Sequence, residues 1–436
     1  MKKLHYMVVV VSLLGLIMQS CSSNKEKTSD TAESQKEISI NYEQLLGSVQ
    51  EAFDARDTSH IVPLLAADFS VSTQTWPASA FMLQQVFLRS NLKCKVELSD
   101  KEVLRLPDGR VKAELKYIFE DTTKVSNIVL NRYGKIEYVD YFDQQYGLFR
   151  DKPSKLVATV PFEFRNGKIV LKLRLNDNTD ELNFLFDTGA DGMAITDSLA
   201  KVQGLKVARS QSTSVVGGNV DVQISSGNTV HLGDVVIPNR NIAIFNQRRD
   251  DTDGILGITL ANRYIVRVDF DESLIYLYSL GSYEDEDKEH TVHVTVPAGL
   301  AIIDGGLNVK GEKDVQGRFV FDTGAKFSLV CFNNFVSKNR LLVSGFDYDS
   351  VSNMTSMGQN TTVYNGSVKE FWLGDKQVVV ENMPVSMQAS TGRKDWVPSA
   401  DGSLGIYFTE NYNFTINLVA KEITFSSRKN KTGADE

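Results

Sequence analysis

One short motif occurs twice in the chain with nearly the same neighbours. Residues 184–190 read FLFDTGA, and residues 319–325 read FVFDTGA. A second pair follows in the same order, DGILG at 253–257 and DGSLG at 401–405. Two motifs that recur in the same order indicate two copies of one structural unit. The second half of the chain is therefore predicted to fold as two related lobes.

The chain around these motifs reads as almost entirely β-strand. Apolar and β-branched runs are separated by turn signals, which favours a β barrel or sandwich for each copy. The clearest strand-like runs in the first copy are 157–164, 169–175, 182–186, 235–237 and 265–269. An acidic run at 283–289 separates the copies and is predicted to be a solvated linker. The lobes are expected at 155–282 and 290–428.

The segment before the lobes, 40–150, has a different pattern. Apolar residues fall on one face of a predicted helix over 41–54, with Asn41 as its N-cap, and a second helix is predicted over 79–89. Alternating residues follow, with Gly109 and Gly134 at turns, as antiparallel hairpins require. This segment is predicted to be a small α+β domain.

The first residues indicate export. Lys2 and Lys3 precede an apolar run over 6–18, which is typical of a secretory signal peptide and is expected to occupy residues 1–20. The position of Cys21 resembles a bacterial lipobox, which implies a lipid on Cys21 and an anchor in the cell envelope, at the periplasmic side or the surface of the outer membrane. A plain signal with an incidental Cys21 is the alternative. Residues 21–39 are polar and predict a flexible tether.

Composition excludes some functions. The formal net charge of -8 argues against nucleic acid as a partner, since phosphate contacts need clustered Lys and Arg. No zinc-ligand spacing occurs, so no metal or other cofactor is expected. Beyond Cys21, Cys94 and Cys331 fall in different predicted domains and are expected to be isolated thiols, with a disulfide as the alternative.

The repeated Asp-Thr-Gly motif indicates a pair of carboxyl groups that could act together. An apolar strand would deliver each Asp into a tight turn, and Gly would let the backbone approach the carboxylate. Two carboxylates brought about 3 Å apart cannot both ionise, so they share one proton. Such a pair can take a proton from water and give one to a carbonyl oxygen. The alternative is that Asp and Gly only serve turn geometry in a duplicated barrel.

These residues carry a resemblance to a known family. Residues 156–428 resemble a two-lobed aspartic peptidase, and each lobe is more similar to a retropepsin-like unit than to a pepsin lobe. The resemblance implies a mainly β fold with two pseudosymmetric β-barrel lobes, active as a single chain on a peptide or protein. It implies that 255–257 and 403–405 run behind the active loops. It also implies catalytic Asp187 and Asp322, with the loops supported by Thr188, Gly189, Thr323 and Gly324.

Two departures from the pepsin pattern bear on the site. Ala190 and Ala325 follow the Gly, where pepsins have a hydroxyl that can donate to the carboxylate. Without that donor the pair is expected to titrate at higher pH than in pepsin. Ser403 replaces an apolar residue in the second supporting motif, and this is expected to affect local packing more than activity.

Two glycine-bearing segments are candidates for flaps that close over a substrate. One contains Gly217 and Gly218, and the other contains Met357 and Gly358. They follow their Asp-Thr-Gly motifs at similar separations along the sequence, as expected for a pseudosymmetric enzyme. Two ordinary hairpins are the alternative.

The N-terminal domain resembles the NTF2-like cone fold, with 131–136 similar to its last hairpin. It is expected to serve as a docking or spacer module, although such a cone can hold a ligand. The whole chain is predicted to be an aspartic endopeptidase anchored in the envelope. The alternatives are a peptide-binding lipoprotein that does not cut, and a protein whose functional site is the N-terminal cone.

Overall fold

The computed structural model describes residues 40–89, 94–215, 218–245, 251–311, 313–356, 359–389 and 399–429. The predicted signal peptide, the tether and Cys21 lie outside these residues. Residues Ile40–Glu436 form one compact unit. Within the described residues, no helix is both long and apolar enough to cross a membrane.

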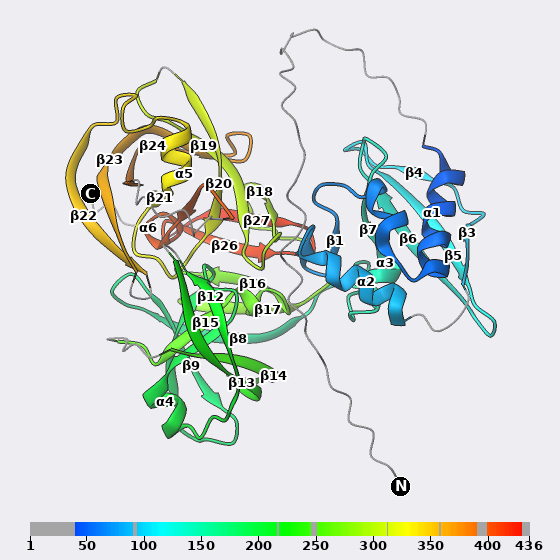
Figure 1. Cartoon of the computed structure of the whole chain (residues 1–436), viewed down its shortest axis with the longest axis horizontal. Helices are drawn as coiled ribbons and strands as arrows, with labels where there is room; N and C mark the ends of the chain where they lie inside the picture. Colours follow the sequence, from blue (N-terminus) through cyan, green and yellow to red (C-terminus); the bar gives the residue numbers. More distant parts are fainter. Residues whose placement is uncertain are drawn as a thin grey trace. The chain divides into compact units, whose positions relative to one another are not determined.

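The N-terminal domain contains helices followed by an antiparallel sheet (Figure 1). Its elements are α1 (Tyr42–Ala55), η1 (Thr58–His60), η2 (Val62–Leu64), β1 (Ser70–Val71), β2 (Gln74–Thr75), α2 (Ser79–Arg89), β3 (Lys95–Leu98), β4 (Leu104–Arg105), β5 (Val111–Ile118), β6 (Thr123–Leu130), β7 (Ile136–Val139) and α3 (Asp140–Gln144). The sheet has the order β3-β5-β6-β7, with β4 also paired to β5.

Local signals in the sequence account for most of these boundaries. The Asn41 side chain accepts a hydrogen bond from the Gln44 backbone N–H at 3.0 Å, so it caps α1 as predicted. Gly109 and Gly134 adopt φ of +83° and +75° in the two predicted turns. The short helix α3 was not predicted, because five residues are too few to show a helical period.

Aromatic side chains fill the interior of this domain. Phe53 and Phe87 pack edge to face with ring centroids 5.0 Å apart, and Tyr117 stacks on Tyr141 at 4.4 Å. These rings belong to one cluster of buried side chains that joins both helices to the sheet. The helices and the sheet of this domain therefore share one hydrophobic core.

The rest of the described chain forms two β-rich lobes. The first contains β8 (Leu156–Phe164), β9 (Ile169–Leu175), β10 (Leu182–Asp187), β11 (Met193–Thr196), α4 (Asp197–Val202), β12 (Val207–Val215), β13 (Gly218–Leu232), β14 (Val235–Phe245), β15 (Gly254–Gly257), η3 (Ile258–Leu260), β16 (Tyr264–Asp269) and β17 (Leu274–Ser279). The second contains β18 (His290–Thr295), β19 (Ile302–Asn308), β20 (Asp314–Phe321), β21 (Leu329–Cys331), α5 (Asn333–Lys338), β22 (Tyr348–Ser356), β23 (Gln359–Leu373), β24 (Val378–Gln388), β25 (Gly402–Leu404), α6 (Ile406–Thr409), β26 (Tyr412–Asn417) and β27 (Glu422–Ser427).

The two lobes repeat the same strand pairings. In the first, β15 runs parallel to β10 and antiparallel to β11, and in the second β25 runs parallel to β20 and antiparallel to β21. The registers also correspond, because Phe186 lies opposite Leu256 and Phe321 lies opposite Leu404. The predicted mainly β fold with two related lobes is therefore confirmed.

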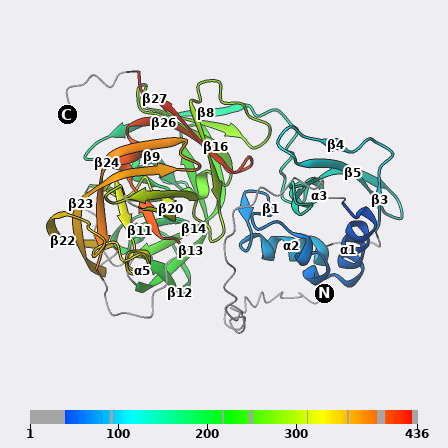
Figure 2. The same ribbon diagram turned by 90° about the horizontal axis from the view of Figure 1, so that it is seen from above.

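One antiparallel sheet joins the lobes. Strands β8, β17 and β16 come from the first lobe and pair in that order. Strand β16 then pairs with β26 of the second lobe, with Val266 opposite Ile416, and β26 continues to β27 and β18 (Figure 2). This sheet ties together segments that are far apart in the sequence.

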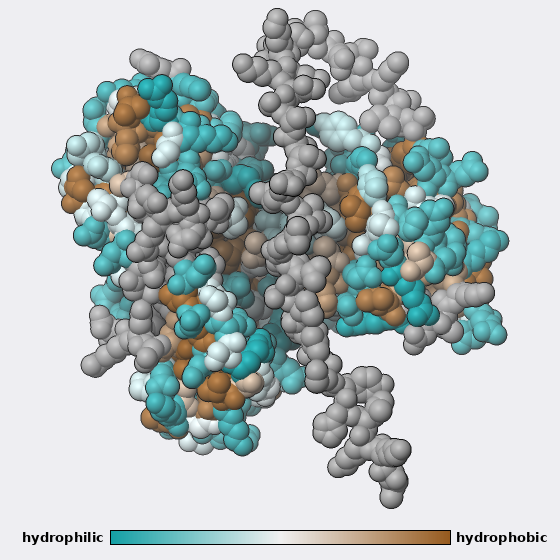
Figure 3. Space-filling model, viewed as in Figure 1, coloured by the Kyte–Doolittle hydropathy of each residue, from teal (hydrophilic) through white to brown (hydrophobic). Residues whose placement is uncertain are grey.

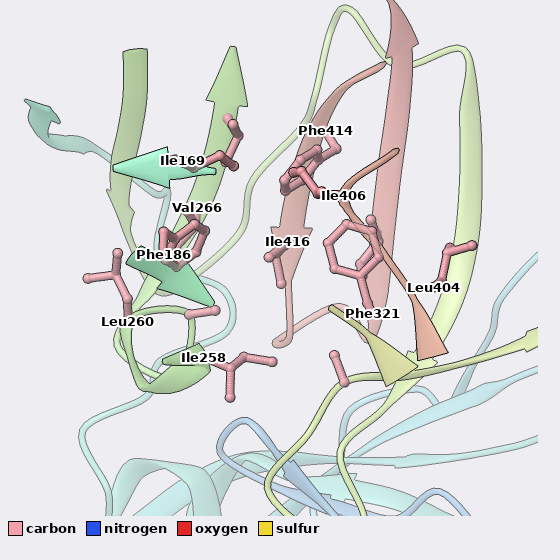
Figure 4. Packing of buried hydrophobic residues seen from close by; sticks show 14 of the residues in the cluster. Ile169, Phe186, Ile258, Leu260, Val266, Phe321, Leu404, Ile406, Phe414 and Ile416 are labelled. Carbon is pink, nitrogen blue, oxygen red and sulfur yellow. The ribbon is translucent and has the colours of Figure 1, made fainter. Parts of the chain in front are cut away.

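The buried side chains of both lobes form one continuous hydrophobic cluster. Figure 4 shows Phe186 beside Val266 in the first lobe and Phe321 close to Ile416 in the second. The Phe321 ring packs edge to face on Phe414, with centroids 5.1 Å apart. On the face shown in Figure 3, hydrophilic residues cover most of the described surface, with hydrophobic residues in small groups. The apolar residues just before each Asp-Thr-Gly therefore lie in a common core.

The acidic segment between the lobes is only partly a solvated linker. Asp285 accepts hydrogen bonds from the hydroxyls of Thr415 and Thr424 at 2.7 and 2.6 Å. Arg267 on β16 lies 3.6 Å from Asp285 and 2.7 Å from Asp287. The prediction of a plain linker was wrong for Asp285, because the joining sheet brings hydroxyl and guanidinium donors to it.

Candidate active site

Two equivalent strands deliver the two aspartates to the same place. Asp187 is the last residue of β10, and Asp322 directly follows β20. Phe184 and Phe186 in β10 are fully buried, as are Phe319 and Phe321 before Asp322. These apolar residues anchor each strand in the core, so the carboxyl group is held where the strand ends.

The two loops lie in direct contact. A Cβ added to Gly189 would lie 2.3 Å from the Cγ of Asp322, and one added to Gly324 would lie 2.1 Å from the Cγ of Asp187. No side chain fits at such distances, so each glycine lets its loop pack over the carboxyl group of the other lobe. The structure thus brings both aspartates together.

Two fully buried threonines interlock the loops. The Thr188 hydroxyl donates to the Phe321 carbonyl at 2.6 Å and accepts from the Thr323 N–H at 3.0 Å. The Thr323 hydroxyl mirrors this, donating to the Phe186 carbonyl at 2.8 Å and accepting from the Thr188 N–H at 3.1 Å. Each hydroxyl therefore satisfies one donor and one acceptor of the opposite lobe, and the two loops are held at one level.

Each carboxyl group also accepts a hydrogen bond within its own loop. The Gly189 N–H donates to Asp187 Oδ1 and the Gly324 N–H donates to Asp322 Oδ1, both at 3.0 Å. Asp322 also accepts a hydrogen bond from the strand behind its loop, because the Ser403 Oγ lies 3.0 Å from Asp322 Oδ2. Ser403 was expected to affect local packing, and the structure adds this contact with the carboxyl group.

The surroundings of the pair shift its protonation. Burial, followed by the charge of the neighbouring Asp187, raises the pKa of Asp322 to about 8, although hydrogen bonds from Ser403 and Gly324 act in the opposite direction. The pair therefore keeps one proton near neutral pH. The missing donor at Ala190 and Ala325 led to the prediction that the pair titrates at higher pH than in pepsin. In the structure, the main cause of the raised pKa of Asp322 is burial of its carboxyl group.

A pair of aspartates that sequence reasoning left without a role supports the two strands. Asp253 Oδ2 accepts from the Asn183 N–H at 2.7 Å, and Asp401 Oδ2 accepts from the Arg318 N–H at 2.9 Å. Each bond extends the parallel pairing behind an Asp-Thr-Gly strand. The signal was present in the sequence, because both supporting motifs begin with Asp-Gly.

The described strands on either side of the two candidate flaps form two long hairpins. Strands β12 and β13 pair up to Val215 opposite Gly218, and β22 and β23 form the equivalent hairpin in the second lobe. Gly218 is the first residue of β13. Gly217, Met357 and Gly358 lie outside the described residues, so their role as flaps stays a prediction.

The cysteines and the potential metal ligands were also predicted from the sequence. Cys94 and Cys331 are both free and buried, as expected, and they lie in separate hydrophobic clusters. Across the described ranges, no group of three or more His, Cys, Asp or Glu side chains is arranged to hold a metal ion.

Three comparisons with known proteins were made. A family model described as aspartyl protease matches residues 171–260, which include Asp187 and the first supporting motif. The chain is similar to the aspartic proteinase from Irpex lacteus, with 13% identity, a TM-score of 0.42, and coverage of 65% of this chain and 100% of that one. A search of curated proteins finds no significant match. The first lobe is therefore similar to an aspartyl protease family over residues 171–260, and the second lobe repeats its motifs and strand pairings.

Proposed function

We propose that this protein is an aspartic endopeptidase that acts as a single chain. The observation that carries the proposal is the pair of interlocked loops, in which Asp187 and Asp322 meet and the fully buried Thr188 and Thr323 cross between lobes. Turn geometry alone could explain Asp and Gly in each loop. It would not explain why the two loops lie in contact with their carboxyl groups together. This arrangement suits acid-base catalysis by a shared proton.

In the proposed reaction, a water molecule lies between the two carboxyl groups and the peptide carbonyl. The ionised carboxylate takes one proton from this water as its oxygen forms a bond to the carbonyl carbon. The protonated carboxyl group gives its proton to the carbonyl oxygen, which yields a neutral tetrahedral intermediate. The carboxyl group that took the water proton then gives it to the nitrogen. The C–N bond breaks as one hydroxyl of the intermediate returns a proton to the other carboxylate, which releases an acid and an amine and leaves the pair with one proton.

The alternative is a peptide-binding protein that uses the same lobes without cutting. Asp-Thr-Gly is intact in both copies, and both loops have the same hydrogen bonds from Gly189 and Gly324, which favours the enzyme. The residues on which the proposal rests all lie in the two lobes, and the N-terminal domain contributes none of them.

The test is hydrolysis of a diverse peptide mixture by the purified mature protein, with and without a statine inhibitor. Asp187→Asn and Asp322→Asn should each remove turnover almost entirely, because each carboxyl group has one role in the shared proton system. Asp177→Asn and Asp375→Asn are matched controls, since both side chains are exposed in turns, one in each lobe. Near-normal turnover in either dyad variant would refute the proposal.

We also propose that a lipid on Cys21 anchors the protein in a bacterial cell envelope. Cys21→Ser should move the mature protein from the membrane pellet to the soluble fraction. The lipid would be its anchor, because the mature sequence contains no apolar run of about 20 residues that could span a membrane. The measurement is immunoblotting of both fractions after confirmed signal cleavage. A processed Cys21→Ser protein that stays in the pellet would contradict the anchor.

A further inference from the structure

Ser403 occupies a buried position directly behind the second aspartate. It is the middle residue of β25, it is 3% exposed, and it pairs with Val320 of β20 and Val330 of β21. Its hydroxyl lies 3.0 Å from Asp322 Oδ2, while the other carboxyl oxygen accepts from Gly324. An ionised carboxylate can only accept hydrogen bonds, so Ser403 is the donor whenever Asp322 is charged.

The equivalent position in the first lobe carries no hydroxyl. Val320 pairs with Ser403 in the second lobe, and Leu185 pairs with Ile255 in the first. Ile255 has only carbon in its side chain, so this particular contribution acts on one side of a pseudosymmetric site. Ala190 and Ala325, which occupy the usual donor position after the Gly, cannot replace it.

We propose that Ser403 is a positioning residue that stabilises the ionised form of Asp322 and so helps Asp322 to release its proton as the acid of the pair. A donor to a carboxylate favours its charged form. This hydrogen bond opposes burial and the charge of Asp187, which hold the proton on Asp322. The inference rests on the proposed function and deepens it, because it separates the roles of two aspartates that the repeated sequence does not distinguish.

The proposal predicts a change in only one limb of the pH profile. The Ser403 hydroxyl stabilises the charge that forms when Asp322 loses its proton, so its loss should raise the upper apparent pKa of the pair and leave the lower one nearly unchanged. Ser403→Ala should therefore move the alkaline limb of kcat/KM upward by about one pH unit. A purely structural role would lower kcat/KM at every pH without moving that limb.

The experiment measures this profile and, in parallel, the carbon-13 chemical shifts of aspartate carboxyl groups across the same pH range in the full mature protein. Ser386→Ala is the matched control, because Ser386 lies opposite the same Val330 on the other side of β21 and bonds to Asn365 instead of the pair. Ser403→Cys keeps the volume with a weak donor and should shift the limb in the same direction.

An unchanged upper pKa of the pair in Ser403→Ala, or in Ser403→Cys where the alanine variant does not fold, would overturn the inference. An equal shift in Ser386→Ala would overturn it as well. If the wild-type protein cuts no peptide, the proposed function fails, while the carboxyl titration still decides whether Ser403 stabilises the charge on Asp322.

Discussion

At the scale of single residues, the site depends on where two carboxyl groups are placed. An aspartate side chain has no unusual acidity of its own, but burial, followed by the charge of Asp187, raises the pKa of Asp322 to about 8. Gly189 and Gly324 make the contact between the two loops feasible, since any Cβ there would overlap a carboxyl group. The chemistry is thus created by the surroundings of the residues.

The raised pKa leads to a stability prediction that needs no assay of activity. The pKa of Asp322 is higher in the folded protein than its ordinary value of 3.8, so the folded state binds more protons between about pH 4 and about pH 8. Stability therefore falls as pH rises through that window. Asp322→Asn lacks the titrating group and should become more stable than the wild type above about pH 8.

The measurement is the urea midpoint of both proteins from acidic to alkaline pH. Asp375→Asn serves as control, because its side chain is exposed and its loss should leave the wild-type pH slope intact. If the urea midpoints of the wild type and Asp322→Asn depend on pH in the same way, the fold does not raise the pKa of Asp322.

At the scale of elements, the strand and loop of each lobe act as one unit with those of the other. The hydroxyls of Thr188 and Thr323 connect the ends of β10 and β20, and Asp253 and Asp401 hold the same strands from behind. Four side chains thus fix two loops without a covalent link.

Thr188→Val should destabilise the protein by about 3 kcal/mol, because valine keeps the shape but leaves the Phe321 carbonyl and the Thr323 N–H buried without this partner. The measurement is the free energy of unfolding in urea, together with peptide turnover, which should fall as the loops loosen. Thr159→Val on β8 is the control, since this threonine is exposed and the change should cost less than about 0.5 kcal/mol. Equal losses of unfolding free energy in both variants would show that the hydrogen bonds of the Thr188 hydroxyl do not stabilise the two loops.

At the scale of the whole molecule, polar contacts join the N-terminal domain to the second lobe. The Lys421 side chain, only 8% exposed, lies 2.8 Å from the Asp68 carboxylate, and His293 lies 3.4 Å from it. Burial alone would raise the pKa of Asp68, but His293 and Lys421 together lower it far below its ordinary value. Burial lowers the pKa of Lys421, and Asp68 opposes that change.

Asp68→Asn should reduce the free energy of unfolding by about 3 kcal/mol near neutral pH, because the buried Lys421 loses its counter-charge. The folded pKa of Asp68 is lowered, so its contribution is present above the unfolded value of 3.8 and is lost as pH falls below it. The difference between variant and wild type should therefore shrink in acid, as followed by urea unfolding. Asp100→Asn breaks an exposed ion pair with Lys116 and should have little effect. A constant difference at all pH values would contradict this account.

Local features of the sequence determined much of this protein. The helices at 42–55 and 79–89 follow from spacing and capping, and the two lobes follow from a repeat that can be read directly. Asp187 and Asp322 could be singled out because the motif around them occurs twice. These signals lie within a few residues of each other, so no tertiary contact is needed to see them.

Only the tertiary structure decided which side chains act on the aspartates and how the lobes join. The pairing of β16 with β26 and the contact of Asp285 with Thr415 connect residues that are distant in the chain. Ser403 looked like a packing change, because the expected place of 403–405 behind the active loop does not show that its hydroxyl reaches the Asp322 carboxyl group. A hydroxyl gains its role from the group that a neighbouring strand brings to within about 3 Å of it, and that distance is set by the fold.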